Sequence, residues 1–205
     1  MALTKAKCEQ CPLRKYHESS GRFEPLDFVC NGSDILVLGD APSKQATGMG
    51  RAWGDRYGAE VAEALQEAGS GANEVDWGNL IGCRWPKDDP KTFLALLKKR
   101  NRKRVSKGLE PELSPIDACR GHVLDELKKY KLIIPMGSLA TKAVYGTNPS
   151  LDDVRGGPSK KGEHLVLPTY HPDQLVMQPK LRPVLRSDIA KALRHHEEAL
   201  RWVDP

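Results

Sequence analysis

The chain has 205 residues, of which 39% are hydrophobic and 29% are charged, which is the balance of an ordinary soluble globular protein. That balance excludes a disordered tail protein and a collagen-like repeat, and a chain of this length buries a core large enough to fold without disulfides. No apolar run approaches the roughly 20 residues that span a bilayer, so we expect no insertion into a membrane. Residues 1–8 contain no apolar signal segment, which predicts a cytoplasmic protein.

The net charge of +5 comes from one stretch of the chain. No acidic residue lies within 91–107, and the basic residues there are Lys91, Lys98, Lys99, Arg100, Arg102, Lys103, Arg104 and Lys107. Such a density of positive charge is typical of a surface that contacts the phosphate backbone of a nucleic acid. The alternative interpretation is a solvated, mobile surface insertion, and the charge pattern alone favours neither.

Short apolar runs predict four buried β-strands, at 34–39, 75–82, 131–137 and 164–169. We expect residues 1–32 to be irregular and residues 40–50 to form a loop, because both stretches are rich in polar and helix-breaking residues. The third and fourth strands end at Gly137 and Thr169, and the latter delivers His171 to the end of its strand.

The segments between these strands predict helices. Residues 57–68 have apolar side chains at helical spacing and end at Gly69. Ser114 followed by Pro115 is a helix start, and Cys119 falls on the apolar face of that helix. We expect Ser138 to cap a helix that ends near residue 145, and a closing helix over 186–202. Residues 92–107 begin with an apolar face and turn into the basic run.

Strands that alternate with helices predict a single α/β domain over residues 1–205, with a mainly parallel central sheet flanked by helices. In such sheets functional loops gather at the carboxyl ends of the strands. Three candidate site segments fall at such ends, and these are residues 40–42, 79–83 and 171–172. The sequence therefore predicts one functional site at this edge of the sheet.

Five cysteines in a protein expected to be cytoplasmic indicate metal or redox chemistry rather than disulfides. Cys8 and Cys11 have the spacing that lets two thiolates reach one metal centre, and with Cys83 and Cys119 they provide four ligands for zinc or an iron–sulfur cluster. Only one pair is closely spaced, which favours a cluster. The alternative interpretation is that Cys83 and Cys119 are small buried apolar residues. Cys30 is expected to be a free thiol.

A series of short motifs follows in order along residues 8–195. They are Cys8-Glu9-Gln10-Cys11, Gly39-Asp40-Ala41-Pro42, Gly50-Arg51-Ala52-Trp53, Gly78-Asn79 with Cys83-Arg84-Trp85-Pro86, Ile133 to Ala140, Val154-Arg155-Gly156 and Tyr170-His171-Pro172. Taken together, they resemble the family-4, iron–sulfur branch of the uracil-DNA glycosylase superfamily. The resemblance implies a three-layer α/β sandwich with a 4Fe–4S cluster bound at one side.

The resemblance places the four cluster ligands on Cys8, Cys11, Cys83 and Cys119. Residues 84–118, between the last two, form a longer interval than in the family and contain the basic run, which implies an insertion at about 87–113 beside the DNA-binding face. A related branch that traps itself covalently on DNA uses a histidine in this region. Residues 84–118 contain no histidine, so we expect no such activity.

The resemblance also implies a base-excision site. The target base leaves the stack and enters a pocket, where Ala41, Trp53 and Asn79 would bind it, Trp53 by stacking and Asn79 by hydrogen bonds to the base edge. His171 would stabilise negative charge on the departing base, and Asp40 would orient water and stabilise positive charge on the sugar. The alternative interpretation is structural, with Trp53 a core side chain and Asn79 a turn residue.

Further positions are implied for DNA contact. Leu175 would wedge into the gap that the flipped base leaves, and the expected DNA-binding cations are Arg100, Arg102, Lys103, Arg104 and Arg155. This chain departs from the family in having Asp40 where a glutamate is usual and Trp53 where a phenylalanine is usual. Both changes alter the pocket.

These residues predict a monomeric DNA glycosylase that hydrolyses uracil, or a related and modified pyrimidine base, from single- or double-stranded DNA. One alternative is a catalytically weak DNA-binding protein that keeps the fold and the cluster. Another is a glycosylase dedicated to a modified base that a Trp-lined pocket would accept.

Overall fold

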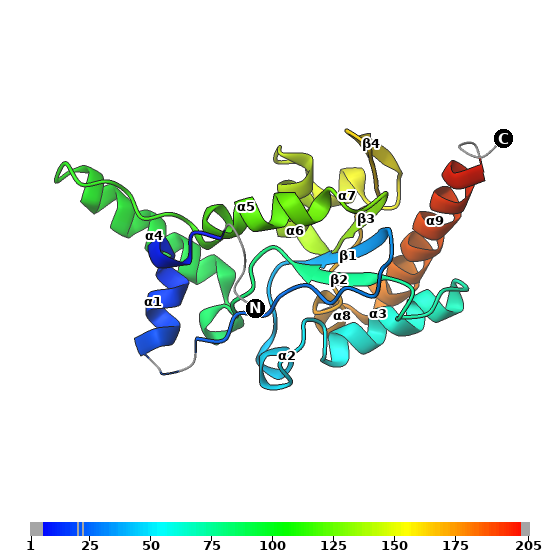
Figure 1. The fold of residues 1–205 in the computed structure, drawn as a ribbon, viewed down its shortest axis with the longest axis horizontal. Coiled ribbons are helices and arrows are strands. Elements are labelled where there is room, and N and C mark those ends of the chain that lie inside the picture. The colour runs from blue at the N-terminus through cyan, green and yellow to red at the C-terminus, as the bar shows by residue number, and fades with distance from the viewer. Residues whose placement is uncertain (1–5, 20, 22, 202–205) are drawn as a thin grey trace.

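A computed structural model describes residues 6–201 of the protein except residues 20 and 22. At its centre lies a five-stranded sheet in the order β2-β1-β3-β5-β4 (Figure 1). Neighbouring strands run parallel, apart from the antiparallel pair β4 and β5. The mainly parallel α/β architecture is confirmed, and β4 is a strand that the sequence pattern missed. The bounds are β1 Ile35–Gly39, β2 Asp76–Asn79, β3 Leu132–Pro135, β4 Ser159–Lys161 and β5 His164–Val166.

Successive side chains of the central strands point to opposite faces of the sheet and fill two separate cores. Leu36 and Ile133 are fully buried in one core, and Val37 and Ile134 are fully buried in the other. Helices cover both faces, so the fold has three layers, as expected. The first core is covered by α5 (Pro115–Leu127) and α6 (Gly137–Tyr145), and the second by α3 (Arg56–Glu67) and α9 (Arg182–Arg201).

Two predicted helix starts agree with the structure and one does not. Helix α3 begins after Asp55, whose carboxylate accepts hydrogen bonds from two backbone N–H groups of the first turn, and α5 begins after Ser114, whose hydroxyl accepts one. The prediction that Ser138 caps the next helix is wrong. Helix α6 already begins at Gly137, because the glycine adopts a φ of 88° and turns the chain directly out of β3.

Other expectations need correction as well. The stretch 1–32 is not wholly irregular, since it contains a 3₁₀ turn (Cys8–Gln10) and helix α1 (Pro12–Ser19), and the expected loop 40–50 contains helix α2 (Lys44–Gly48). Helix α9 begins at Arg182 rather than Arg186, while residue 202 lies outside the described residues. Further short elements are α7 (Leu151–Val154), α8 (Gln174–Met177) and 3₁₀ turns at Pro86–Asp88 and Pro179–Leu181. Within the described residues, no helix combines the length and apolar character needed to cross a membrane.

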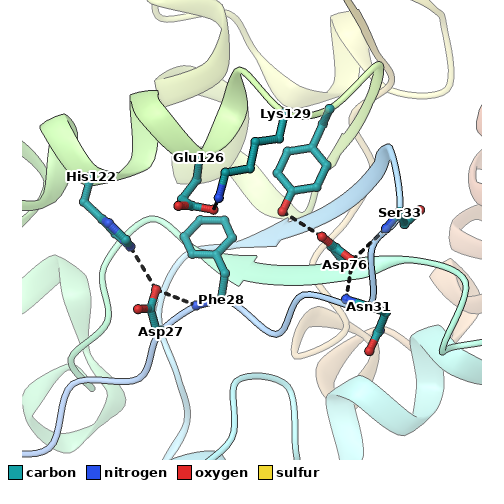
Figure 2. Close-up of polar contacts among 9 residues, drawn as sticks. Asp27, Phe28, Asn31, Ser33, Asp76, His122, Glu126 and Lys129 are labelled. Carbon is teal, nitrogen blue, oxygen red and sulfur yellow. Dashed lines mark hydrogen bonds and ion pairs between the residues drawn. The ribbon is translucent and has the colours of Figure 1, made fainter. Parts of the chain in front are cut away.

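Polar contacts hold the segment before β1 against strand β2 and helix α5 (Figure 2). The buried carboxylate of Asp76 accepts hydrogen bonds from the backbone N–H of Asn31 at 2.6 Å and from the Tyr130 hydroxyl at 3.0 Å. Asp27 lies 3.0 Å from the Nε2 of His122 on α5. The network explains how a segment rich in polar residues is held in one path that leads from α1 to the sheet.

The basic run lies on an ordered arm. Helix α4 (Pro90–Val105) projects away from the sheet, at the left in Figure 1, and residues 106–114 return along it. The Asn101 side-chain amide donates to the Glu112 carbonyl oxygen at 2.9 Å and accepts from the Glu112 N–H at 2.8 Å. Arg104 donates to the Glu110 carbonyl oxygen at 2.8 Å. These contacts join α4 to residues 106–114, so the arm has a defined structure.

Candidate active site

A cavity of about 380 Å³ opens at the carboxyl ends of the parallel strands. Its size falls in the range typical of small-molecule sites. The five residues that the sequence placed at the base and the reacting bond all line it, namely Asp40, Ala41, Trp53, Asn79 and His171. They come from segments that are distant in the chain, and the parallel sheet brings these segments together.

Trp53 forms an aromatic wall of the cavity, and close contacts with Gly78 and Gly39 fix its position. The indole N–H of Trp53 donates to the Gly78 carbonyl oxygen at 2.9 Å, and the Trp53 backbone has a φ of 59°, a conformation that non-glycine residues rarely adopt. A Cβ on Gly39 would lie 2.6 Å from the Trp53 ring and 2.7 Å from the Asn79 side-chain oxygen. A glycine at position 39 is therefore what allows Trp53 and Asn79 to meet across the end of β1.

Asp40 follows β1 and faces the cavity. Its carboxylate accepts a hydrogen bond from the Ala140 N–H, in the first turn of α6, at 2.9 Å. Burial raises the pKa of Asp40 to about 6, although the charge of His171 and the Ala140 hydrogen bond act in the opposite direction. Asp40 is therefore a carboxylate that changes charge near neutral pH, which suits a group that orients or activates water.

His171 also lines the cavity, with its ring centroid 5.5 Å from that of Trp53 and its side chain 17% exposed. Its Nδ1 lies 2.8 Å from a carboxylate oxygen of Asp173. A Cβ on Gly137 would come within 3.1 Å of the His171 Cβ, so α6 begins directly against the histidine. The imidazole thus has one fixed neighbour on its Nδ1 side, within a mostly buried position.

Asp188 of α9 stabilises the loop that carries His171. The Asp188 side chain is 1% exposed. Asp188 accepts a hydrogen bond from the Thr169 hydroxyl at 2.9 Å and pairs with Arg155 at 3.0 Å. Arg155, which we expected to bind DNA, holds the strand end and the closing helix together, because Asp188 removed from water requires a cationic partner. The Arg155 side chain is still 29% exposed, so its contact with DNA stays a prediction.

The expected wedge residue also needs correction. Leu175 is 4% exposed and packs in the second core, because the one-turn helix α8 directs it inward. The exposed side chains of this helix are Val176, at 55%, and Met177, at 84%. In this structure Leu175 is therefore a core residue, whereas its two successors are exposed.

Three acidic residues of the cavity were not singled out from the sequence, namely Asp55, Asp88 and Asp173. Asp55, 9% exposed, caps α3 and accepts a hydrogen bond from the Ser43 hydroxyl. Asp173 contacts His171. The position of Asp55 before an apolar-patterned helix was a usable cap signal. No sequence signal gives the contact of Asp173, because it depends on the conformation of a loop. Lys44 and Arg56 also line the cavity.

Three cysteines belong to the first core, and a fourth, Cys8, lies near them. Cys11, Cys83 and Cys119 are buried, Cys8 is half-buried, and none forms a disulfide. Burial raises the pKa of the Cys83 thiol, and the thiols of the other three add to this shift, which means that all four sulfurs lie within electrostatic reach of one another. The Lys7 N–H donates to the Ala118 carbonyl oxygen at 2.7 Å and thereby holds the N-terminal pair beside α5.

Four thiols that lie near one another are a ligand set that fits an iron–sulfur cluster or a zinc ion. Among the described residues, no three metal-ligand side chains are arranged to hold one metal ion. The Gly82 N–H donates to the Cys119 sulfur. Backbone donors of this kind are typical around cluster sulfurs.

The cations on the arm fall into two groups. Arg100 pairs with Glu112 at 3.1 Å and Arg104 bonds to the Glu110 carbonyl oxygen, so both hold the arm together. Arg102 and Lys103, with the neighbouring Lys98 and Lys99, are exposed to solvent. The second group is therefore the positive surface that this arm presents.

The sequence matches the family described as "Uracil DNA glycosylase superfamily" over residues 26–195. The chain is also similar to three proteins named "Type-4 uracil-DNA glycosylase". That of Thermotoga maritima is 29% identical, with 91% of this chain and 88% of the relative covered. The protein of Sulfurisphaera tokodaii is 26% identical, covering 90% and 78%, and that of Pyrobaculum aerophilum is 24% identical, covering 89% and 86%. Because the family match spans most of the chain and the parallel sheet agrees with it, this protein belongs to the uracil-DNA glycosylase superfamily.

Proposed function

We propose that the protein is a DNA glycosylase that flips uracil, or a related pyrimidine, out of DNA and releases it by hydrolysis. The observation that carries this proposal is the convergence of Asp40, Trp53, Asn79 and His171 on one cavity. An aromatic face, an amide, a carboxylate and an imidazole are the groups that base capture and glycosidic cleavage require. The names of the relatives agree with this activity.

Each side chain then has one task. The flipped base stacks on Trp53 and bonds through its polar edge to Asn79, with Ala41 beside it. As the glycosidic bond breaks, the electron pair moves to the base, and a hydrogen bond from His171 stabilises the negative charge that develops there. Asp40, when ionised, stabilises the positively charged sugar and orients the water that attacks it. As the water oxygen bonds to the sugar carbon it gives one proton to Asp40 and from there to solvent, and the base anion takes up a proton from solvent, so the products are the free base and an abasic site.

We also propose that Cys8, Cys11, Cys83 and Cys119 hold a 4Fe–4S cluster. When bound, the cluster would supply covalent cross-links between segments rather than chemistry at the base. Its ligands belong to the N-terminal turn, the loop after β2 and helix α5. The cluster would thereby fix the loop after β2, whose residues Trp85 and Asp88 line the cavity.

The arm is proposed to contact DNA phosphates. Replacing Lys99, Arg102 and Lys103 together by glutamine should weaken DNA binding for every sequence alike. The slope of log affinity against log salt concentration should become shallower by about 0.7–0.9 for each phosphate that is no longer neutralised. The slope is measured by fluorescence anisotropy over a salt series, with Lys128→Gln next to α5 as the matched control. An unchanged slope in the triple variant would mean that the arm does not contact DNA phosphates.

We propose that Met177, assisted by Val176, takes the role of the wedge. An exposed apolar side chain just beyond the His171 loop can fill the gap that a flipped base leaves. Met177→Ala should slow base release from double-stranded DNA and leave the rate on single-stranded DNA nearly unchanged, because a single strand has no stack to fill. Single-turnover rates on the two substrates measure this. An equal reduction on both would remove Met177 from this role.

The proposal as a whole is tested with a panel of oligonucleotides that each contain one uracil or one modified pyrimidine. Abasic product is revealed by alkaline cleavage and gel electrophoresis. Cleavage of the uracil strand supports the proposal. Cleavage of a modified strand alone would assign a dedicated modified-base enzyme. Tight binding without abasic product from any strand would favour a DNA-binding protein that keeps the fold.

A further inference from the structure

Backbone strain in this protein is concentrated in the walls of the cavity. Among the described residues, three that are not glycine have a positive φ, namely Trp53 at 59° and the consecutive Lys87 and Asp88 at 55° each. Trp53 and Asp88 both line the cavity. Non-glycine residues rarely adopt this conformation, and they keep it only where the surrounding structure holds them in it. Trp53 is held by its indole hydrogen bond and by the glycines beside it. Lys87 and Asp88 need a restraint of their own.

Arg84 supplies that restraint. Its guanidinium donates two hydrogen bonds to the Asp88 carboxylate, from Nε at 2.7 Å and from a terminal nitrogen at 3.0 Å. A planar fork that matches a carboxylate in this way fixes both the direction and the distance of its partner. In the same turn the Asp88 N–H donates to the Trp85 carbonyl oxygen at 3.0 Å, and the Asp89 N–H donates to that of Pro86 at 3.1 Å. The fork thus joins the two ends of the strained turn, residues 84–88.

The turn lies between two fixed parts of the protein. On its N-terminal side Trp85 is buried, and the Arg84 carbonyl oxygen lies 2.8 Å from the Nε2 of His17 on α1. On its C-terminal side the Asp89 carboxylate caps α4, because it accepts a hydrogen bond from the Thr92 N–H at 3.0 Å. Since both flanks are fixed, the path of the turn between them is what the fork determines.

The fork also neutralises a charge in the cavity wall. Asp88 lines the cavity together with three other acidic residues, Asp40, Asp55 and Asp173. Without Arg84, the Asp88 carboxylate would add an uncompensated negative charge to this wall. In the proposed reaction the departing base becomes negative, and like charges repel. Loss of Arg84 should therefore both relax the wall and oppose base release.

We propose that Arg84 is a positioning residue, which holds the strained turn 84–88 in the cavity wall through its fork on Asp88. This inference rests on the proposed function, because base release is its first readout. Arg84 acts through Asp88 and has no contact with the base. Its loss should consequently slow base release more than the loss of an equally exposed ion pair elsewhere in the protein.

The chain offers a matched control in another arginine–carboxylate pair. Arg14 donates to Glu18 at 2.6 Å across the same spacing of four residues, and neither residue lines the cavity. The side chains of this pair are 27% and 46% exposed, against 26% and 51% for Arg84 and Asp88. Arg14 also lies within electrostatic reach of Cys8, so its substitution accounts for the loss of a cation near the cysteines.

The test compares single-turnover release of uracil from a single-stranded oligonucleotide at saturating protein concentration. Arg84→Gln should be slower than the wild-type protein by about two- to a hundredfold, the range expected for coupled residues in contact. Arg84→Lys should be nearly as slow, because an ammonium group has no fork. Arg14→Gln should keep the wild-type rate. Equal rates in Arg84→Gln and Arg14→Gln would overturn the inference.

A second substitution separates the turn from a general loss of stability. Glycine adopts a positive φ freely, and Asp88→Gly also removes the carboxylate that Arg84 neutralises. The double variant Arg84→Gln/Asp88→Gly should therefore recover most of the lost rate, although it lacks both partners of the ion pair. A double variant as slow as Arg84→Gln would show that Arg84 does not act through the turn.

Hydrogen exchange on the free protein tests the turn without any substrate. The peptide that covers residues 84–92 should exchange faster in Arg84→Gln, and Arg14→Gln should leave its exchange unchanged. Unchanged exchange in Arg84→Gln would overturn the inference, whatever the rate of base release. If exchange responds as expected but the wild-type protein releases no base, the proposed function is wrong, and the hold of Arg84 on the turn is still supported.

Discussion

Replacing Asp40 with asparagine should slow base release by about a hundred- to ten-thousandfold, the usual contribution of a positioned acid–base group. Asparagine is nearly the same size and keeps an oxygen that can accept the Ala140 hydrogen bond. The slower rate would therefore report the missing negative charge, which matters mainly when the sugar becomes positive. DNA affinity should stay close to that of the wild-type protein, because this charge acts in the transition state.

The titration of Asp40 also predicts the direction in which the rate of base release changes with pH. The pKa of Asp40 is raised to about 6 by burial, so the wild-type rate should fall as the pH drops through that value and the carboxylate takes up a proton. The residual rate of Asp40→Asn should lack this acid limb. Single-turnover rates over an acidic pH series provide the measurement. A variant that loses little rate, or that keeps the limb, would mean that another group supplies the charge.

Changing Cys119 to serine should abolish stoichiometric iron binding and strongly destabilise the protein. Binding of a structural metal centre contributes directly to the free energy of folding. Removal of such a centre belongs to the few mechanisms that cost more than about 4 kcal/mol. For a chain of this length, each kcal/mol corresponds to about 2–4 °C in Tm, so a fall of roughly 8–16 °C is expected.

The matched control is Cys30→Ser, because Cys30 is an exposed free thiol that lies outside the cysteine group. Anaerobic preparations are analysed for iron and sulfide and then melted under calorimetry. Equal iron in the two variants would contradict the ligand assignment. Stoichiometric zinc without iron in the wild-type protein would show that these cysteines bind zinc and not a cluster.

The sheet and the cavity were predictable from the sequence for a simple physical reason. Buried parallel strands are continuous apolar runs, and residues 34–39 and 131–137 contain such runs. Their carboxyl ends share one edge, so the polar residues that follow them had to gather there. The strand β4 has no such run, since Ser159–Lys161 is a polar edge strand held by its pairing with β5.

The side-chain partners were less predictable, because they depend on loop paths. Leu175 and Met177 differ in exposure only through the direction of one helical turn, which no periodicity fixes over so short a stretch. Arg155 resembles any surface cation until its partner Asp188, far along the chain, is known. The contact of Asp173 with His171 likewise follows from the conformation of one loop.

The most direct measurement is the fate of a uracil-containing oligonucleotide in water enriched in the heavy oxygen isotope. Mass spectrometry of the products after incubation with the wild-type protein should find free uracil and abasic DNA in equal amounts. The heavy oxygen should be on the abasic sugar and absent from the base, because water attacks the sugar carbon. Recovery of intact oligonucleotide, or of DNA covalently attached to the protein, would contradict hydrolytic base excision in this cavity.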